Sequence, residues 1–144
     1  MLLLLYVVDV DLKKSNPQLP DVSFLLDVLN NSLEVKKESI YTLMITFKAL
    51  NYEVPSHLLE DFYNEFESYS SSLNINKTNL FIILEESLKK RNLAETVFIV
   101  LDLLNSSNNE QLNYYYLYKS INSLNNIGLR AYAREFGLEI NFGL

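Results

Sequence analysis

The sequence contains no cysteine and a single histidine, His57. Disulfide bonds, thiolate nucleophiles and cysteine-ligated zinc are therefore excluded, as are sites built from several histidines. Glycine is also scarce, and its three copies all lie at position 128 or later. A phosphate-binding loop needs glycines that let the backbone approach the ligand, so no such loop is expected earlier in the chain. These absences argue against most enzymes, and we expect no catalytic activity, no cofactor and no bound metal.

Positive charge is scarce as well, since twelve lysines and arginines stand against eighteen aspartates and glutamates, for a formal net charge of −6. Nucleic-acid binding depends on clustered cations that neutralise phosphates, so we expect no nucleic-acid partner. The apolar start, residues 1–8, is far shorter than the roughly 20 residues that span a bilayer. It also lacks the basic region and cleavage site of a signal peptide. We therefore expect a cytoplasmic protein with no membrane span.

Three glycines and three prolines in 144 residues are too few for a turn-rich β-fold. Apolar residues recur instead every three or four positions, as Val22, Leu25, Leu26 and Leu29 do, which is the period of an amphipathic helix. This pattern predicts seven helices within one domain, 1–144. Their expected ranges begin near residues 21, 38, 55, 76, 93, 110 and 129. The helix over 93–104 is apolar on two faces, so we expect it to be the most deeply buried. Residues 1–12 fit either a helix or a strand.

The C-terminal half contains a faint internal repeat. Shifting residues 80–105 by 36 positions places Leu88 on Leu124 and Val97 on Ala133, and a shift of 34 extends the match toward the N-terminus. A recurring helix, turn, helix and loop of this length is the size of one hairpin in an α-solenoid. The pattern predicts an all-α fold of stacked antiparallel helical hairpins, a short α-solenoid of about three hairpins. A compact helical bundle would show the same periodicity and is the alternative.

The segment 124–136 resembles the middle of a tetratricopeptide-type repeat. It has Gly128 at the turn, the small Ala133 at the close helix contact, and the aromatic Phe136 three residues later. Residues 91–97 are similar, with Asn92 in the glycine position and Val97 in the alanine position. The tryptophan and the proline of the family's pattern are absent. The resemblance covers residues 38–141 and implies a helical-repeat scaffold that binds other proteins.

Four tyrosines fall within the five positions 114–118 of one expected helix. Tyr116 and Leu117 align with core positions of the preceding unit, which leaves the other three nearer the surface. Exposed tyrosine is typical of binding hot spots. We therefore predict three partner-binding anchors: Tyr114, Tyr115 and Tyr118. The alternative is that these rings pack between helices with their hydroxyl groups in water.

The segment 53–67 contains five acidic residues and no lysine or arginine. Complementary charge steers association, so we expect Glu60 and Asp61 to attract a basic partner. A merely solvated helix face is the alternative.

His57 has Glu60 and Asp61 three and four positions later, which places all three on one helix face. One histidine with carboxylates could hold a divalent metal. However, Pro55 places Glu53 outside the helix, and acids in a first helical turn are explained by the helix dipole alone. A metal-dependent enzyme centred on His57 is therefore only a remote alternative.

Together these features predict a non-catalytic protein–protein interaction module, an adaptor or scaffold, that uses the tyrosine-rich face and the acidic segment. The alternative is a helical-bundle regulator or an immunity-type inhibitor that binds a helix or a basic partner in a groove. The apolar N-terminus is a second contact surface if it is exposed, and it could support a homo-oligomer.

Overall fold

The computed structural model describes residues 21–31, 36–66, 75–105 and 114–142. Within these ranges the chain forms seven α-helices and no strand, so the expected all-α class is confirmed there. The helices are α3 (Val22–Asn30), α4 (Lys37–Ala49), α5 (Ser56–Phe66), α6 (Ile75–Lys89), α7 (Leu93–Asn105), α8 (Tyr114–Asn126) and α9 (Arg130–Phe142). The apolar segment 1–8 and the choice between helix and strand for residues 1–12 lie outside the described ranges. None of the described helices is both long and apolar enough to cross a bilayer.

Helix α4 forms the centre of the core, because every residue from Ile40 to Phe47 is buried. A helix that is buried all round must be covered on every side. Helices α3, α8 and α9 pack on α4, and Leu58 and Phe62 of α5 belong to the same core. The hydroxyl groups of the two buried threonines donate to backbone carbonyls one turn back, at 2.8 and 2.9 Å, so they need no partner from another helix.

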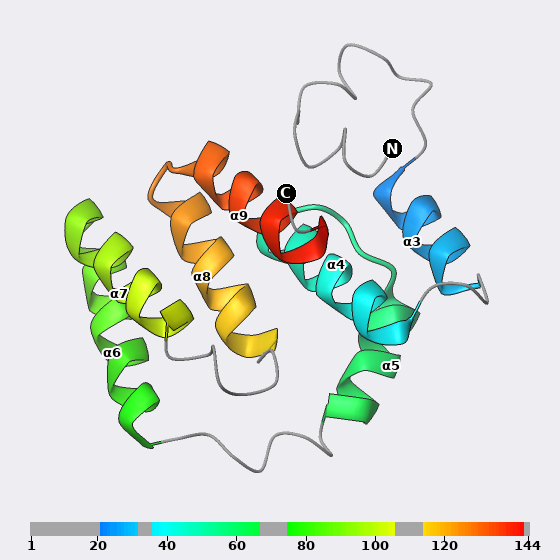
Figure 1. Cartoon of the computed structure of the whole chain (residues 1–144), viewed down its shortest axis with the longest axis horizontal. Coiled ribbons are helices and arrows are strands. Elements are labelled where there is room, and N and C mark those ends of the chain that lie inside the picture. Colours follow the sequence, from blue (N-terminus) through cyan, green and yellow to red (C-terminus); the bar gives the residue numbers. More distant parts are fainter. Residues whose placement is uncertain (1–20, 32–35, 67–74, 106–113, 143–144) are drawn as a thin grey trace.

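The prediction that the helix over 93–104 is the most buried is wrong. In α7, Phe98 is 74% exposed and Leu101 is 53% exposed. Helix α7 lies at one end of the row of helices and packs on α6 and α8, whereas α4 is enclosed (Figure 1). Helix α7 therefore packs one of its two apolar faces on the core and leaves the other face uncovered.

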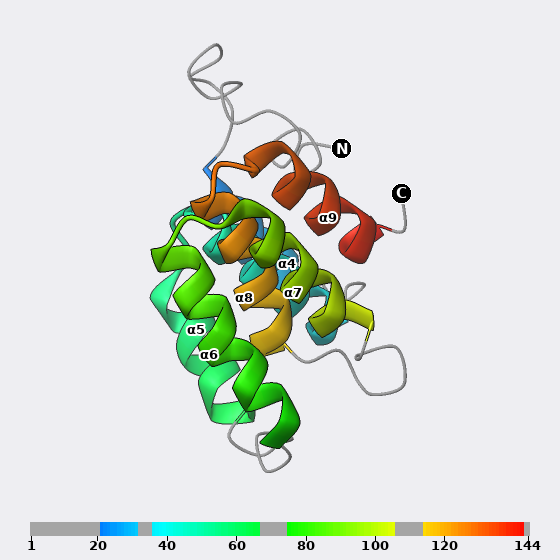
Figure 2. The same cartoon turned by 90° about the vertical axis from the view of Figure 1, so that its left-hand side faces the viewer.

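The helices form a row in which α6 and α7 stand at one end, α8 and α9 follow, and α4 comes next with α3 and α5 beyond it (Figures 1 and 2). Side chains join α6 to α8: the ring centroid of Phe81 lies 5.0 Å from that of Tyr115 and 5.2 Å from that of Tyr116. A second contact is an ion pair, in which Lys119 Nζ lies 2.6 Å from Glu85 Oε1. The partners in the second pair are 34 positions apart, close to the predicted repeat. The first helices of these two hairpins therefore touch through residues that are offset by about one turn from equivalent positions.

Helix α4 packs on the far side of α8, parallel to it. The Tyr114 hydroxyl donates to the carbonyl of Glu38 at 3.5 Å near the start of both helices. Near their ends, Asn125 Nδ2 donates to the carbonyl of Ala49, also at 3.5 Å. The order in space is thus α6, α8, α4, which differs from the order along the chain. The sequential stacking of an α-solenoid is therefore not confirmed, although α4 occupies the place where a further hairpin would follow α8 and α9.

The three parallel helices α4, α6 and α8 end in the same backbone turn. Each is followed by a residue with positive φ: Asn51 at 65°, Arg91 at 51° and Gly128 at 92°. In each turn the next backbone N–H donates to a carbonyl five positions earlier, over 2.9–3.0 Å. These bonds are those of a Schellman motif, which satisfies the last carbonyls of a helix. The C-terminal ends of α4, α6 and α8 therefore have the same backbone structure.

These turns also correct the predicted alignment. The residue that corresponds to Gly128 is Arg91 and not Asn92, because both have positive φ and the same hydrogen bonds. The counterpart of Ala133 is then Thr96 and not Val97, and the side chains of Thr96 and Ala133 are both fully buried. Asn92 instead caps α7, since its side-chain oxygen accepts the N–H of Glu95 at 3.3 Å.

Helix α9 reaches α4 through Gly137. A Cβ atom at this position would lie only 2.6 Å from Cγ2 of Thr46. One turn later, Asn141 Nδ2 donates to Thr46 Oγ1 at 3.0 Å. The absence of a side chain at 137 therefore allows α9 to lie directly against α4.

Replacing Gly137 by alanine should lower the free energy of unfolding by about 1–3 kcal/mol, because the added methyl group overpacks the α4–α9 contact. Alanine alone would favour the helix by about 1 kcal/mol, so a loss of stability isolates the steric term. Thr46→Ser keeps the hydroxyl group and removes Cγ2. Urea unfolding of both single variants and of Thr46→Ser/Gly137→Ala should show recovery in the double variant. Equal losses in Gly137→Ala and in the double variant would contradict the contact.

Arg91→Gly should raise the free energy of unfolding by about 1 kcal/mol, because a residue with a Cβ atom is disfavoured in the left-handed region. Gly128→Ala is the matched opposite change and should lower it by a similar amount, since Gly128 has open space around it but φ of 92°. Thermal unfolding of the two variants measures both effects. A loss of stability in Arg91→Gly would show that the Arg91 side chain stabilises the fold by more than its left-handed backbone conformation destabilises it.

Candidate functional site

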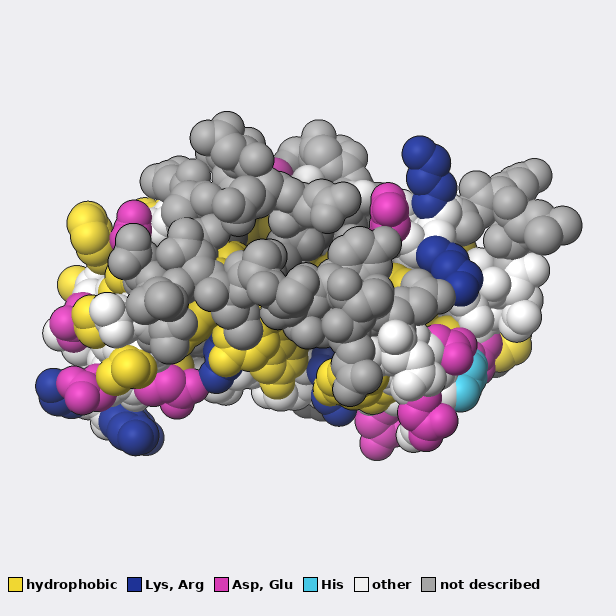
Figure 3. Space-filling view, turned by 90° about the horizontal axis from the view of Figure 1, so that it is seen from below, with side chains coloured by type: hydrophobic (Ala, Val, Ile, Leu, Met, Phe, Trp, Pro, Cys, Tyr) yellow, Lys and Arg dark blue, Asp and Glu magenta, His cyan; other side chains and the backbone are white. Residues whose placement is uncertain are grey.

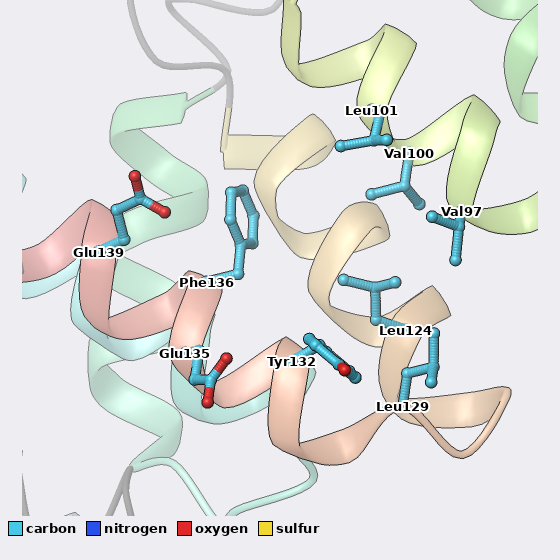
Figure 4. Close-up of a pocket in the computed structure, with 9 residues that line it drawn as sticks. All are labelled: Val97, Val100, Leu101, Leu124, Leu129, Tyr132, Glu135, Phe136 and Glu139. Carbon is cyan, nitrogen blue, oxygen red and sulfur yellow. The ribbon is translucent and has the colours of Figure 1, made fainter.

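An open groove of about 620 Å³ runs between α7 and α9. Helix α8 packs closely on both helices and forms the floor of the groove. Figure 4 shows the side chains of α7 facing those of α9 across Leu124 of α8. The lining residues are mostly apolar: Val97, Val100, Leu101, Leu124, Leu129, Tyr132, Phe136, Glu135 and Glu139. We call this site the α7–α9 groove.

Large apolar side chains on both walls of the α7–α9 groove are open to solvent. Leu101 on α7 is 53% exposed and Tyr132 on α9 is 63% exposed. Phe98, one turn before Leu101, extends the apolar surface of α7 beyond the groove. A concave apolar site of several hundred Å³ has the usual size of a ligand site, and contiguous exposed apolar patches mark interaction surfaces.

The α9 side of the groove carries two carboxylates one helical turn apart, Glu135 and Glu139. Both are exposed, and neither forms an ion pair with a residue that the structure describes. Like charges at this spacing cost a helix about 0.2–0.5 kcal/mol. Glu139 also lies in the last turn of α9, where the helix dipole disfavours an acid. The opposite wall, α7, contains no lysine or arginine.

The predicted anchor Tyr114 is half-buried and joins three helices. Its ring packs on Phe62 of α5 with centroids 5.3 Å apart, and on Tyr41 of α4 at 6.5 Å. Its hydroxyl group reaches the backbone of Glu38. Tyr114 therefore stabilises the arrangement of α4, α5 and α8.

Tyr115 is the most exposed of the three predicted anchors, at 41%. Its ring lies edge-on against Phe81, and Lys119 Nζ is 5.8 Å from the ring centroid. The hydrogen bond between Lys119 and Glu85 lowers the pKa of the Glu85 carboxyl group and raises the pKa of the Lys119 amine. Tyr115 thus belongs to a small charged and aromatic surface on the α6 side of α8.

The structure does not bring the three tyrosines together on one face. Tyr118 is half-buried against the core, while Tyr114 faces α5 and Tyr115 faces α6. Tyr116 and Leu117 are buried, as the sequence predicted.

Glu60 and Asp61 are exposed on α5, far along the chain from the groove residues. Figure 3 shows acidic side chains gathered beside the histidine. His57 Nε2 lies 3.0 Å from Asp27 Oδ1 of α3, a residue that the helical spacing did not point to. Glu53 precedes α5, as expected. In the described parts of the chain, no three histidine, aspartate or glutamate side chains are grouped so that they could hold a metal ion.

Comparisons of the chain with protein-family models, with curated proteins and with solved structures give no significant match. The resemblance to tetratricopeptide-type repeats therefore remains a prediction.

The α7–α9 groove was not predicted from the sequence, because the helix over 93–104 was expected to be the most deeply buried. One signal was present, since residues 93–104 are apolar on two faces and only one of them could pack on the hairpin partner.

Replacing Tyr114 by alanine should lower the free energy of unfolding by about 2–3 kcal/mol, because a half-buried ring and its aromatic contacts are lost. Tyr115→Ala should cost only about 1 kcal/mol, since this ring is more exposed and has one main neighbour. Chemical denaturation followed by circular dichroism compares the two variants. Equal losses would show that Tyr114 does not hold α5 against α4 and α8.

Proposed function

We propose that this protein is a non-catalytic interaction module, an adaptor or scaffold, whose protein partner docks in the α7–α9 groove. The observation that carries the proposal is the exposure of Leu101 and Tyr132 on opposite walls of one apolar groove. Burying a large apolar side chain stabilises a complex by about 1.5–3 kcal/mol, so covering both walls supplies a substantial part of a binding energy.

The arrangement of the hairpins supports a repeat-like scaffold for this role. Helices α6 and α8 touch through residues 34 positions apart, and α4, α6 and α8 share the same C-terminal turn. We also propose that α6–α9 stack as in an α-solenoid. We further propose that the protein is cytoplasmic, as the sequence predicts. In helical-repeat proteins, the stacked repeats form extended concave binding surfaces.

The exposed side of Tyr115, with Lys119 beside it, is the second candidate surface. It is the part of the predicted tyrosine face that remains open to solvent. Glu60 and Asp61 lie on another helix and would steer a basic partner toward the molecule as a whole.

Site-specific photocrosslinking tests which surface a partner covers. A benzophenone amino acid is placed at position 132 in the groove, at position 115 on the second surface, or at position 63. Tyr63 is the matched control, because it is 61% exposed while Tyr132 is 63% exposed. We expect one discrete adduct from position 132 and none from position 63, and the adduct should disappear in a Leu101→Lys background.

The identified partner is then purified and crosslinked again in a mixture with this protein alone. An adduct from position 115 only would move the docking site to the tyrosine surface. Equal adducts from all three positions, or none at all, would contradict an interaction module with a defined site.

A further inference from the structure

Resting on the proposed function, we propose that the α7–α9 groove binds a short amphipathic helix from a partner protein, with lysine or arginine on the flank that faces Glu135 and Glu139. The apolar face of this helix would lie on the groove walls.

The length of the groove fits two turns of a helix. Its α9 wall runs from Tyr132 to Glu139, which at 1.5 Å per residue is about 10–11 Å. Helices that dock in grooves use anchors at positions i, i+3 or i+4, and i+7, which span the same distance. The lining side chains repeat at one-turn intervals on both walls, at 97 and 101 on α7 and at 132 and 136 on α9. Side chains spaced in this way can interdigitate with those of a third helix.

The charges of the groove specify a basic occupant. Glu135 and Glu139 repel each other, and Glu139 also opposes the dipole of α9. Cations on a docked helix would relieve both effects at once. The opposite wall lines the groove with Val97, Val100 and Leu101 and adds no charged side chain. The two arginines of α9 are not among the residues that line the groove.

Other occupants fit these charges less well. A second copy carries a net charge of −6 and would be repelled over the whole surface. The apolar start of this chain has no lysine or arginine in residues 1–11, and it contains Asp9 and Asp11. Neither therefore brings a net positive charge to Glu135 and Glu139.

Two designed helical peptides of about 14 residues test the inference, both with the same leucines at helix-in-groove spacing. One has lysine on the flanks and the other has glutamate. Fluorescence anisotropy with the full chain should show that the lysine peptide binds about tenfold more tightly, and that rising salt weakens it. Glu135→Gln/Glu139→Gln should weaken the lysine peptide about tenfold and remove most of the salt dependence.

Glu38→Gln/Glu86→Gln is the matched control, because it removes two exposed carboxylates on other helices. It should change the affinity by no more than about twofold. Tyr132→Ala should weaken both peptides, whereas Phe98→Ala, which removes an exposed ring outside the groove, should not. Circular dichroism verifies that each variant is folded.

Equal affinity for the two peptides, or an equal effect of the two glutamine pairs, would overturn the inference. Failure of both peptides to bind would also overturn it. So would concentration-dependent dimers of this protein that still form in the Glu135→Gln/Glu139→Gln variant. In each of these cases a crosslink from position 132 to another protein would leave the proposed function standing. Loss of that crosslink as well would remove both.

Discussion

The structure depends on the need to cover α4 on every side. A helix with eight consecutive buried residues cannot stand at the edge of a protein, and one neighbouring hairpin cannot enclose it. Helices α3, α8 and α9 and the buried side chains of α5 together provide the cover. This requirement explains why α4 packs against α8 and α9, the last hairpin of the chain, and not only against the helices next to it in the sequence.

The placement of α4 leaves the other end of the row uncovered. Helix α8 has α6 and α7 on one side and α4 on the other, while α7 keeps one apolar face in solvent. Repeat proteins usually end in units with a polar outer face. The exposed Phe98 and Leu101 depart from this rule, and Leu101 lines the groove that α7 forms with α9. The same asymmetry thus accounts for the compact core and for the candidate binding site.

Hydrophobic periodicity was sufficient to predict the all-α class and the seven helices that the structure describes, because apolar residues recurring every three or four positions need only local spacing to be recognised. The turn after α6 was misaligned by one residue, since an arginine holds the left-handed position that glycine or asparagine usually holds. The position of α4 could not be predicted, because it depends on Gly137 meeting Thr46 across the chain. The groove was missed for a similar reason. The sequence shows that Leu101 and Tyr132 are large apolar residues on helices, but only tertiary packing shows that no helix covers them.

The contact between α4 and α9 also affects the order in which the protein can fold during synthesis. Thr46 and Asn141 are 95 positions apart, so at typical rates of translation α4 waits roughly 5–20 s for the helix that completes its cover. During this interval the apolar side chains of α4 are available to other nascent chains and to chaperones. Contacts of such long range also slow folding after release, because the loop entropy is lost before the core forms. The hairpins α6/α7 and α8/α9, whose contacts are local, can form first and serve as the template on which α4 becomes buried.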